Sequence, residues 1–192
     1  MVNKISTNVA DYFLENNIIQ EKEIEIYMYG LKLIISSFLG ISIILFIGIM
    51  LGRFTESIVF LFCFITLRQY SGGYHADSYF KCNLYFITTF LITEASVIFT
   101  QENYIDFLSV GMFCTSLVIL LIFAPVDNKN KRLSQSQKLK NKKISLIIFA
   151  VLLAVAILLK TTVDNYYYNI VATVFSVTAL MIIQILEEEN GK

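Results

Sequence analysis

The sequence predicts an all-α protein, a polytopic integral membrane bundle of about six transmembrane helices with an amphipathic N-terminal region. Hydrophobic residues make up 56% of the 192 positions and charged residues only 16%, whereas a soluble domain has about 45–50% and about 25%. The mean hydropathy is +0.67. Several apolar runs along the chain have close to the roughly 20 residues that a helix needs to cross a membrane. We therefore expect one membrane-embedded domain over residues 1–192, with the lipid bilayer as its main partner.

The charge balance and the cysteine content argue against several other classes of protein. Fifteen basic residues balance fifteen acidic ones, so the chain has no global basic field and we expect no nucleic-acid partner. Three cysteines are an odd number, and Cys63 and Cys114 lie in apolar runs, which is unlike a disulfide framework or a paired C-x-x-C metal site. We expect no cofactor and no metal. The N-terminus does not have the pattern of a cleavable signal peptide.

Residues 1–29 alternate apolar side chains with charged ones, as at Ile5, Val9 and Phe13. This pattern predicts one or two amphipathic helices. They could lie on the membrane surface or pack against the cytoplasmic ends of the bundle, and the sequence leaves both alternatives open.

The predicted bundle, 31–186, begins with a 21-residue apolar run over 31–51 whose only charge is Lys32. Residues 52–56 interrupt it. The next apolar run, 57–67, has 11 residues, too few for a full crossing, which predicts a short, tilted or re-entrant segment. Further spans are expected at 83–99, 107–124, 144–160 and 166–186. Glu94 lies inside one of them and should face the bundle interior, because a carboxylate is costly in lipid.

The segment 125–143 contains seven basic residues, so the positive-inside rule predicts a cytoplasmic basic loop there. Alternating sides along six spans then places both termini and residues 68–82 in the cytoplasm as well. Only Arg53 and Lys160, among the fifteen basic residues, fall on the outer side. The sequence thus predicts a multi-pass protein of the cell membrane with both termini inside.

Residues 68–82 form a polar, glycine-containing segment between two apolar runs, which indicates a functional loop. It holds the one histidine, His75, and the one cysteine in a polar stretch, Cys82. A cysteine nucleophile reacts as the thiolate, which an imidazolium, a basic neighbour or a helix N-terminus favours. Asp77 or Ser78 is the expected N-cap of the next helix, placing Cys82 within about a turn of its positive end.

The spacing of His75 and Cys82 sets a condition on their pairing. Seven residues of continuous helix would separate them by about 10 Å along the axis, so a direct pair requires His75 on a loop that folds back over the helix start. Gly72 and Gly73 supply the backbone freedom, and their N–H groups could stabilise an oxyanion. A partner-satisfied histidine and a zinc site with Asp77 are the alternatives, and the zinc site lacks ligands.

The pattern Arg68-x4-Gly73-x-His75-Ala76-x-Ser78-x3-Cys82, with Ala124-Pro125 ending a span and a lysine-rich loop after it containing Asn130-Lys131, resembles the accessory gene regulator protein B family. The likeness covers nearly the whole chain. One departure is Arg132, where the family often has proline.

The resemblance implies a membrane cysteine endopeptidase of quorum sensing, with Cys82 as nucleophile and His75 as its base. Its partner would be an AgrD-like precursor of an autoinducing peptide, cut toward its C-terminal side and closed into a thiolactone or lactone ring through a thioester on the enzyme. A homodimer is also implied. The expected substrate-binding or supporting residues are Arg68, Gly72, Gly73, Ser78 and Lys131.

A non-enzymatic alternative stays open at this point. A small transporter or channel subunit could use His75, Glu94 and Arg68 to line a polar path through the bundle.

Overall fold

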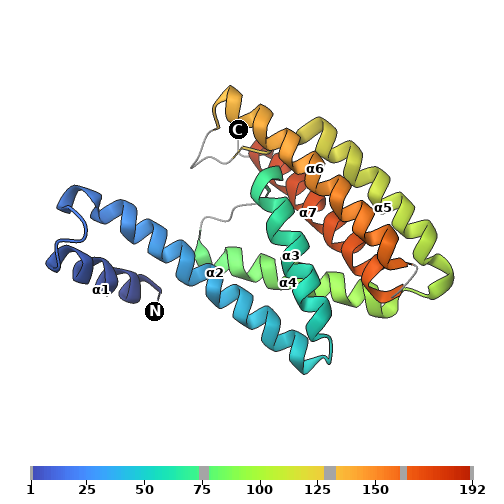
Figure 1. Ribbon diagram of the computed structural model, residues 1–192, viewed down its shortest axis with the longest axis horizontal. Helices are drawn as coiled ribbons and strands as arrows, with labels where there is room; N and C mark the ends of the chain where they lie inside the picture. Colours follow the sequence, from blue (N-terminus) through green and yellow to red (C-terminus); the bar gives the residue numbers. More distant parts are fainter. Residues whose placement is uncertain (1, 74–77, 128–132, 161–163, 191–192) are drawn as a thin grey trace.

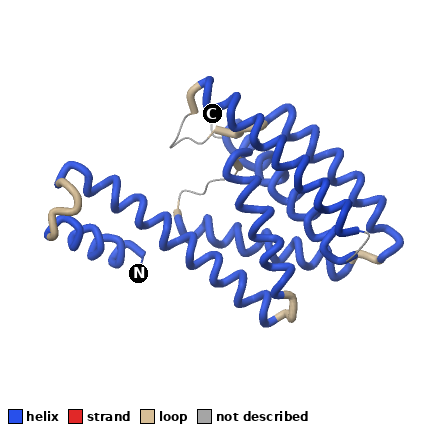
Figure 2. Tube along the Cα trace, viewed as in Figure 1, coloured by secondary structure: helices blue, strands red, loops and turns tan. Residues whose placement is uncertain are grey.

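The computed structural model describes residues 2–73, 78–127, 133–160 and 164–190. These residues are helical apart from short turns and loops and contain no strand (Figure 2), which confirms the predicted all-α class. The elements in chain order are α1 (Val2–Glu15), the 3-10 turn η1 (Glu21–Glu23), α2 (Ile24–Met50), α3 (Phe54–Ser71), α4 (Tyr79–Phe99), α5 (Glu102–Phe123), α6 (Gln135–Lys160) and α7 (Asp164–Asn190).

Helix α7 is the centre of the bundle, with α3, α4, α5 and α6 packed around it (Figure 1). Most of its side chains between Tyr167 and Met181 are buried. A helix covered on several sides must be apolar nearly all round, and the Ile, Val, Leu and Met residues of α7 supply that surface. The core of the protein therefore surrounds the last helix of the bundle.

Five of the described helices are long and apolar enough to cross a membrane: α2, α4, α5, α6 and α7. The outer helices expose large apolar side chains such as Phe38, Ile92, Phe107 and Ile147. Such a surface is costly in water and suits lipid, because lipid tails are as apolar as the side chains. The chain is a polytopic membrane protein.

The predicted short segment belongs to α3, whose 18 residues extend the apolar run 57–67 at both ends. Arg53, just before its first turn, contacts Glu94 of α4, and its last residue, Ser71, accepts a hydrogen bond from Val126 after α5. Helix α3 is not among the five described helices that are long and apolar enough to cross a membrane, so the short, tilted or re-entrant character of this segment stays a prediction. The predicted loop 68–82 is also shorter than expected, because residues 68–71 end α3 and residues 79–82 begin α4.

The helices define two ends of the bundle. The site end is where α3 and α5 finish and α4 and α6 begin, and the far end is where α3, α5 and α7 begin and α4 and α6 finish.

The predicted amphipathic region 1–29 is only partly separate from the first span. Helix α1 folds back along the first turns of α2, with the Phe13 and Tyr27 rings 6.5 Å apart and the Thr7 hydroxyl 4.0 Å from the Met28 sulfur. Residues 24–29 already belong to α2. Helix α1 and the start of α2 extend from the bundle as a hairpin (Figure 1), so α1 packs on α2 and not on the bundle ends.

The predicted basic loop 125–143 also includes helix, since α6 begins at Gln135. Ser134 and Gln137 exchange the hydrogen bonds of a capping box, which fixes this start. Lys138 pairs with Asp127, and the Lys142 ammonium donates to the Leu121 carbonyl at 2.6 Å. Two of the seven basic side chains therefore join α6 to the end of α5.

Candidate functional site

The site is built on the end of α3, where Gly72 is the C-cap with φ 77° and ψ −162°. Only glycine adopts this backbone region readily. A Cβ on Gly72 would lie 2.3 Å from the Val126 carbonyl oxygen, and the Val126 N–H donates to the Ser71 carbonyl at 2.9 Å. The chain after α5 is thus docked against the end of α3, and Gly72 leaves the room for it.

Arg68 lies in the last turn of α3 and lines the approach to this end. Its guanidinium carbon is 5.2 Å from the centre of the Phe64 ring, a cation–π contact. The buried Gly73, with φ 147°, is close by, since a Cβ there would lie 4.0 Å from the Arg68 Nε atom. The positive charge of Arg68 is therefore held between an aromatic ring and the first residues of the loop.

On the other side of the site, Ser78 caps α4. Its hydroxyl accepts a hydrogen bond from the Lys81 N–H at 3.2 Å, and its carbonyl accepts from the Cys82 N–H at 3.0 Å. This confirms Ser78 as the N-cap and places Cys82 in the first turn of α4. A helix N-terminus carries a partial positive charge that favours an anion nearby.

Cys82 is half-buried in the first turn of α4, at the same end of the bundle as Arg68 in the last turn of α3. The other two thiols have different surroundings. Cys63 is buried inside α3 and Cys114 is exposed on the apolar side of α5. Of the three thiols, Cys82 is the one in the first turn of a helix, a position where a thiol can become reactive.

His75, Asp77 and Lys131 lie outside the described residues. The pairing of His75 with Cys82 and the role of Lys131 therefore stay predictions. Gly73 and Ser78, the residues on either side of the segment that contains His75, both belong to the site described above.

The sequence did not indicate how α4 is anchored next to Cys82. The Asn83 amide donates to the Ser36 carbonyl at 3.2 Å and to the Ser36 hydroxyl at 3.1 Å, which attaches the start of α4 to α2. Gly40 makes room for this contact, because a Cβ there would lie 3.0 Å from the Asn83 Oδ1 atom. A polar residue next to Cys82 was the available signal, but its partner lies 47 residues away in the sequence.

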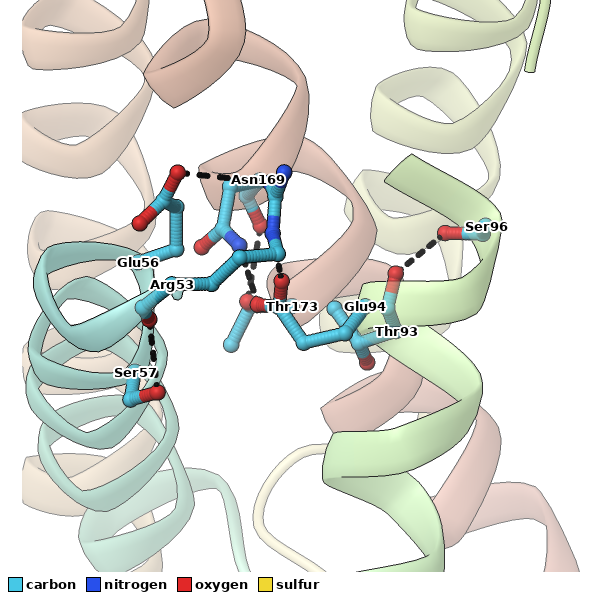
Figure 3. Close-up of polar contacts among 8 residues, drawn as sticks. All are labelled: Arg53, Glu56, Ser57, Thr93, Glu94, Ser96, Asn169 and Thr173. Atoms are coloured by element: carbon cyan, nitrogen blue, oxygen red, sulfur yellow. Dashed lines mark hydrogen bonds and ion pairs between the residues drawn. The ribbon is translucent and has the colours of Figure 1, made fainter. Parts of the chain in front are cut away.

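Glu94 faces the bundle interior, as predicted, but at the far end. Its carboxylate accepts from Arg53 Nε at 2.6 Å and from the Asn169 amide at 2.7 Å (Figure 3). Arg53 was expected, with Lys160, on the outer side, and the structure shows that it is also the partner of Glu94. Arg68 and Glu94 lie toward opposite ends of the bundle.

No group of three or more metal-ligating side chains occurs within the described parts of the chain.

The comparisons with known proteins agree with one another. The model of the family Accessory gene regulator B matches residues 6–186. An AgrB-like protein of Clostridium perfringens strain SM101 is 34% identical over 158 residues, covering 78% of this chain and 73% of the relative. Two further AgrB-like proteins, from C. perfringens strain 13 and from Clostridium beijerinckii, are each 32% identical to this chain. The alignments cover 82% and 80% of this chain, respectively, and 77% of each relative. No solved structure matches the chain significantly.

The matched region begins within α1 and ends within α7, and it includes Arg68, the segment after α3 and Cys82. The family works in the agr quorum-sensing system and is associated with an AgrD precursor peptide. With the predicted motif, the helical bundle and the family model in agreement, the chain belongs to the accessory gene regulator B family.

Proposed function

We propose that this protein is a membrane cysteine endopeptidase that cuts an AgrD-like precursor peptide. The observation that supports it most is the position of Cys82, half-buried in the first turn of α4 and at the same end of the bundle as Arg68. A helix N-terminus carries a partial positive charge that suits an anionic nucleophile. A thiolate is the nucleophile that a cysteine peptidase needs.

In the proposed reaction the Cys82 sulfur attacks the scissile carbonyl carbon of the precursor. The C–N bond breaks, His75 gives its proton to the leaving amine, and the N-terminal part of the peptide stays on Cys82 as a thioester. A thiol of the precursor then attacks the thioester and releases Cys82, which closes a thiolactone ring. A serine hydroxyl in its place would give a lactone. Exclusion of water by the bundle favours ring closure over hydrolysis.

Several basic side chains near the site end could receive an acidic part of the precursor. Arg68 ends α3 at the same end of the bundle as Cys82, and Lys81, Lys140 and Lys143 are exposed near the starts of α4 and α6. Opposite charges at these positions would steer and orient a peptide that carries carboxylates. A charge reversal, Arg68→Glu, that left cleavage unchanged would contradict the part assigned to Arg68.

The orientation in the membrane follows from the same basic residues. We place the site end and both termini in the cytoplasm, because Arg53 and Lys160 are the basic residues at the far end and the rest of the bundle's basic side chains gather toward the site end. A homodimer belongs to the proposal through the family resemblance. Cysteine accessibility from each side and cross-linking in membranes test these two points.

The transporter alternative used Arg68 and Glu94 on one polar path. Glu94 is engaged with Arg53 and Asn169 toward the other end of the bundle from Arg68. This separation favours the peptidase over the alternative.

The test is mass spectrometry of a family-matched precursor co-expressed with the protein. The parent should release a C-terminal fragment and leave a peptide one water lighter than hydrolysis would give. Cys82→Ala and His75→Ala should leave the precursor intact, whereas Cys63→Ala and Cys114→Ala, which remove thiols outside the site, should process it normally. Processing that survives Cys82→Ser or complete alkylation of Cys82 would refute the mechanism.

A further inference from the structure

The contact between α2 and α4 lies directly beside the proposed nucleophile. Asn83 follows Cys82 in the sequence, and its side-chain amide donates to the Ser36 carbonyl at 3.2 Å and to the Ser36 hydroxyl at 3.1 Å. Helices α2 and α4 pack against each other, and Figure 1 shows the start of α4 beside the middle of α2. Cys82 therefore lies one residue from a point at which two helices are joined.

The surface of α2 at this contact is made of small residues. The buried residues of α2 are spaced by four: Ser36, Gly40, Ile44 and Gly48. Residues at this spacing lie on one face of a helix. A Cβ at Gly40 would lie 3.0 Å from the Asn83 Oδ1 atom and 3.2 Å from a ring carbon of Phe86. Small residues let two helices approach closely in a membrane protein, so the Asn83 amide fits closely against α2.

Core packing holds the second half of α4 more firmly than the first. The buried residues of α4 are Thr89, Phe90, Thr93 and Glu94. The first of them lies ten residues after Tyr79, where the helix begins. Between Tyr79 and Thr88 no side chain is buried. Burial in the core therefore does not by itself set how the first turns of α4 are rotated about the helix axis, whereas the directional hydrogen bonds of Asn83 do.

The rotation of α4 decides where the thiol points. Successive residues are about 100° apart around a helix, so an Asn83 side chain that faces α2 directs Cys82 to a neighbouring face of α4. A side-chain atom lies about 5 Å from the helix axis, so a rotation of about 12° moves it by about 1 Å. Misplacement of a reacting group by about 1 Å can lower a rate about 100-fold. A small loss of rotational control would thus be large for the chemistry.

We propose that Asn83 is a positioning residue, whose hydrogen bonds to Ser36 fix the rotation of the start of α4 and with it the direction in which the Cys82 thiol faces. This inference rests on the proposed peptidase function. The amide is bonded to α2, so it acts through Cys82 and touches no substrate. Asparagine is not a strong helix former, and the contact with Ser36 accounts for its place inside α4.

The central variant is Asn83→Leu, which nearly keeps the size of the side chain and removes the amide. Ser36→Ala removes one of the two acceptors and leaves the carbonyl, so its effect should have the same direction and be smaller. The matched control is Thr93→Val, which removes the hydroxyl that lies 3.0 Å from the Ser176 hydroxyl of α7. The control thus loses an interhelical hydrogen bond of the same helix, eleven positions after Cys82.

The first measurement needs no catalysis. In a protein whose other two cysteines are replaced by Ala, spin labels on Cys82 and on an introduced Ile49→Cys report the distance between α4 and α2 by double electron–electron resonance. Ile49 is exposed on α2, about 20 Å along the helix from Ser36. The parent should give one narrow distance distribution. Asn83→Leu should shift or broaden it, and Thr93→Val should leave it unchanged.

The second measurement is the turnover of precursor by the unlabelled protein. Asn83→Leu should lower kcat about 10- to 100-fold with KM nearly unchanged, because the thiol is misplaced while the peptide still binds. Ser36→Ala should lower kcat less, and Thr93→Val should keep the parental value. A contact that only stabilises the protein would lower the unfolding midpoint and leave kcat of the folded protein unchanged.

A folded Asn83→Leu variant with the parental distance distribution and kcat overturns the proposal. An equal loss of kcat in Thr93→Val also overturns it, because the effect would then belong to helix contacts in general. If neither Asn83→Leu nor Ser36→Ala folds, the contact is stabilising and not positioning, and the proposal is wrong. If the parent cleaves no precursor, the peptidase proposal fails, while the distance measurement still decides whether Asn83 fixes the rotation of α4.

Discussion

Replacing Gly72 by alanine tests how the end of α3 is built. At φ 77° and ψ −162° an L-residue costs about 1–3 kcal/mol in backbone conformation alone. The new Cβ would also lie 2.3 Å from the Val126 carbonyl oxygen and 3.0 Å from its nitrogen, so this backbone must retreat by about 1 Å to reach ordinary contact. That movement breaks the 2.9 Å hydrogen bond from Val126 to Ser71, worth about 0.5–1.5 kcal/mol.

The two contributions together predict that Gly72→Ala destabilises the protein by about 2–4 kcal/mol. For a chain of this size each 1 kcal/mol corresponds to about 2–4 °C in the unfolding midpoint, so the expected fall is roughly 4–16 °C. Thermal unfolding of the purified protein in detergent measures it. Precursor processing should fall with it, since Gly72 leads directly into the loop with His75.

Gly52→Ala is the matched control. Gly52 also has a positive φ, 67°, but a Cβ there meets nothing within 4 Å, so only the backbone cost of about 1–2 kcal/mol applies. Gly72→Ala should therefore be the more damaging of the two. Equal midpoints for the two variants would refute the docking of Val126 on the end of α3, and an unchanged Gly72→Ala midpoint would refute the backbone conformation as well.

Two further substitutions test the helix contacts. Ser78→Ala should cost about 1 kcal/mol by removing the N-cap of α4, and Ser78→Asp should keep it; faster hydrogen exchange at the Lys81 amide in the alanine variant alone would show this. Gly48→Ala should lower the unfolding midpoint strongly, because its Cβ would lie 1.8 Å from the Ser57 hydroxyl, whereas Gly30→Ala meets nothing within 4 Å and should be neutral or stabilising. Equal midpoints for the two glycine variants would contradict the close packing of α2 on α3.

The sequence predicted those features that depend on one helix at a time. The long apolar runs identified the crossing helices, because the cost of exposing backbone and charge in lipid acts on each span separately. The cap at Ser78 and the inward face of Glu94 follow from equally local rules. The length of α3 was underestimated because its ends, with Arg53 and Arg68, are polar; Arg53 pairs with Glu94 of α4, and Arg68 lies over the Phe64 ring of its own helix.

Such local patterns could not predict the contacts between helices. Arg53 and Glu94 are 41 residues apart, and Asn83 and Ser36 are 47 apart. Nothing in the local sequence says which of several polar groups will meet. The contact of Val126 with Gly72 is a similar case. The need for glycine at position 72 becomes clear only when it is known that Val126 occupies the space a Cβ would take. The N-cap at Ser78 and the position of Cys82 in the first turn of α4 could therefore be predicted from the sequence, whereas the contacts around them could not.

The central place of α7 has a consequence for how the protein is made. Its partners α3, α4, α5 and α6 all precede it in the chain, so during synthesis they leave the ribosome and enter the membrane first. Until α7 arrives, Glu94 lacks Asn169, Thr93 lacks Ser176 and Ser116 lacks Thr178.

Unsatisfied polar groups in lipid are costly, and each of these three is satisfied by the last helix to be inserted. A chain interrupted before α7 would thus expose its polar groups between loosely held helices and should be removed by membrane proteases. Assembly of this bundle is completed by its final span, so a fusion partner or tag that delays insertion of α7 should lower the yield more than one placed ahead of α1.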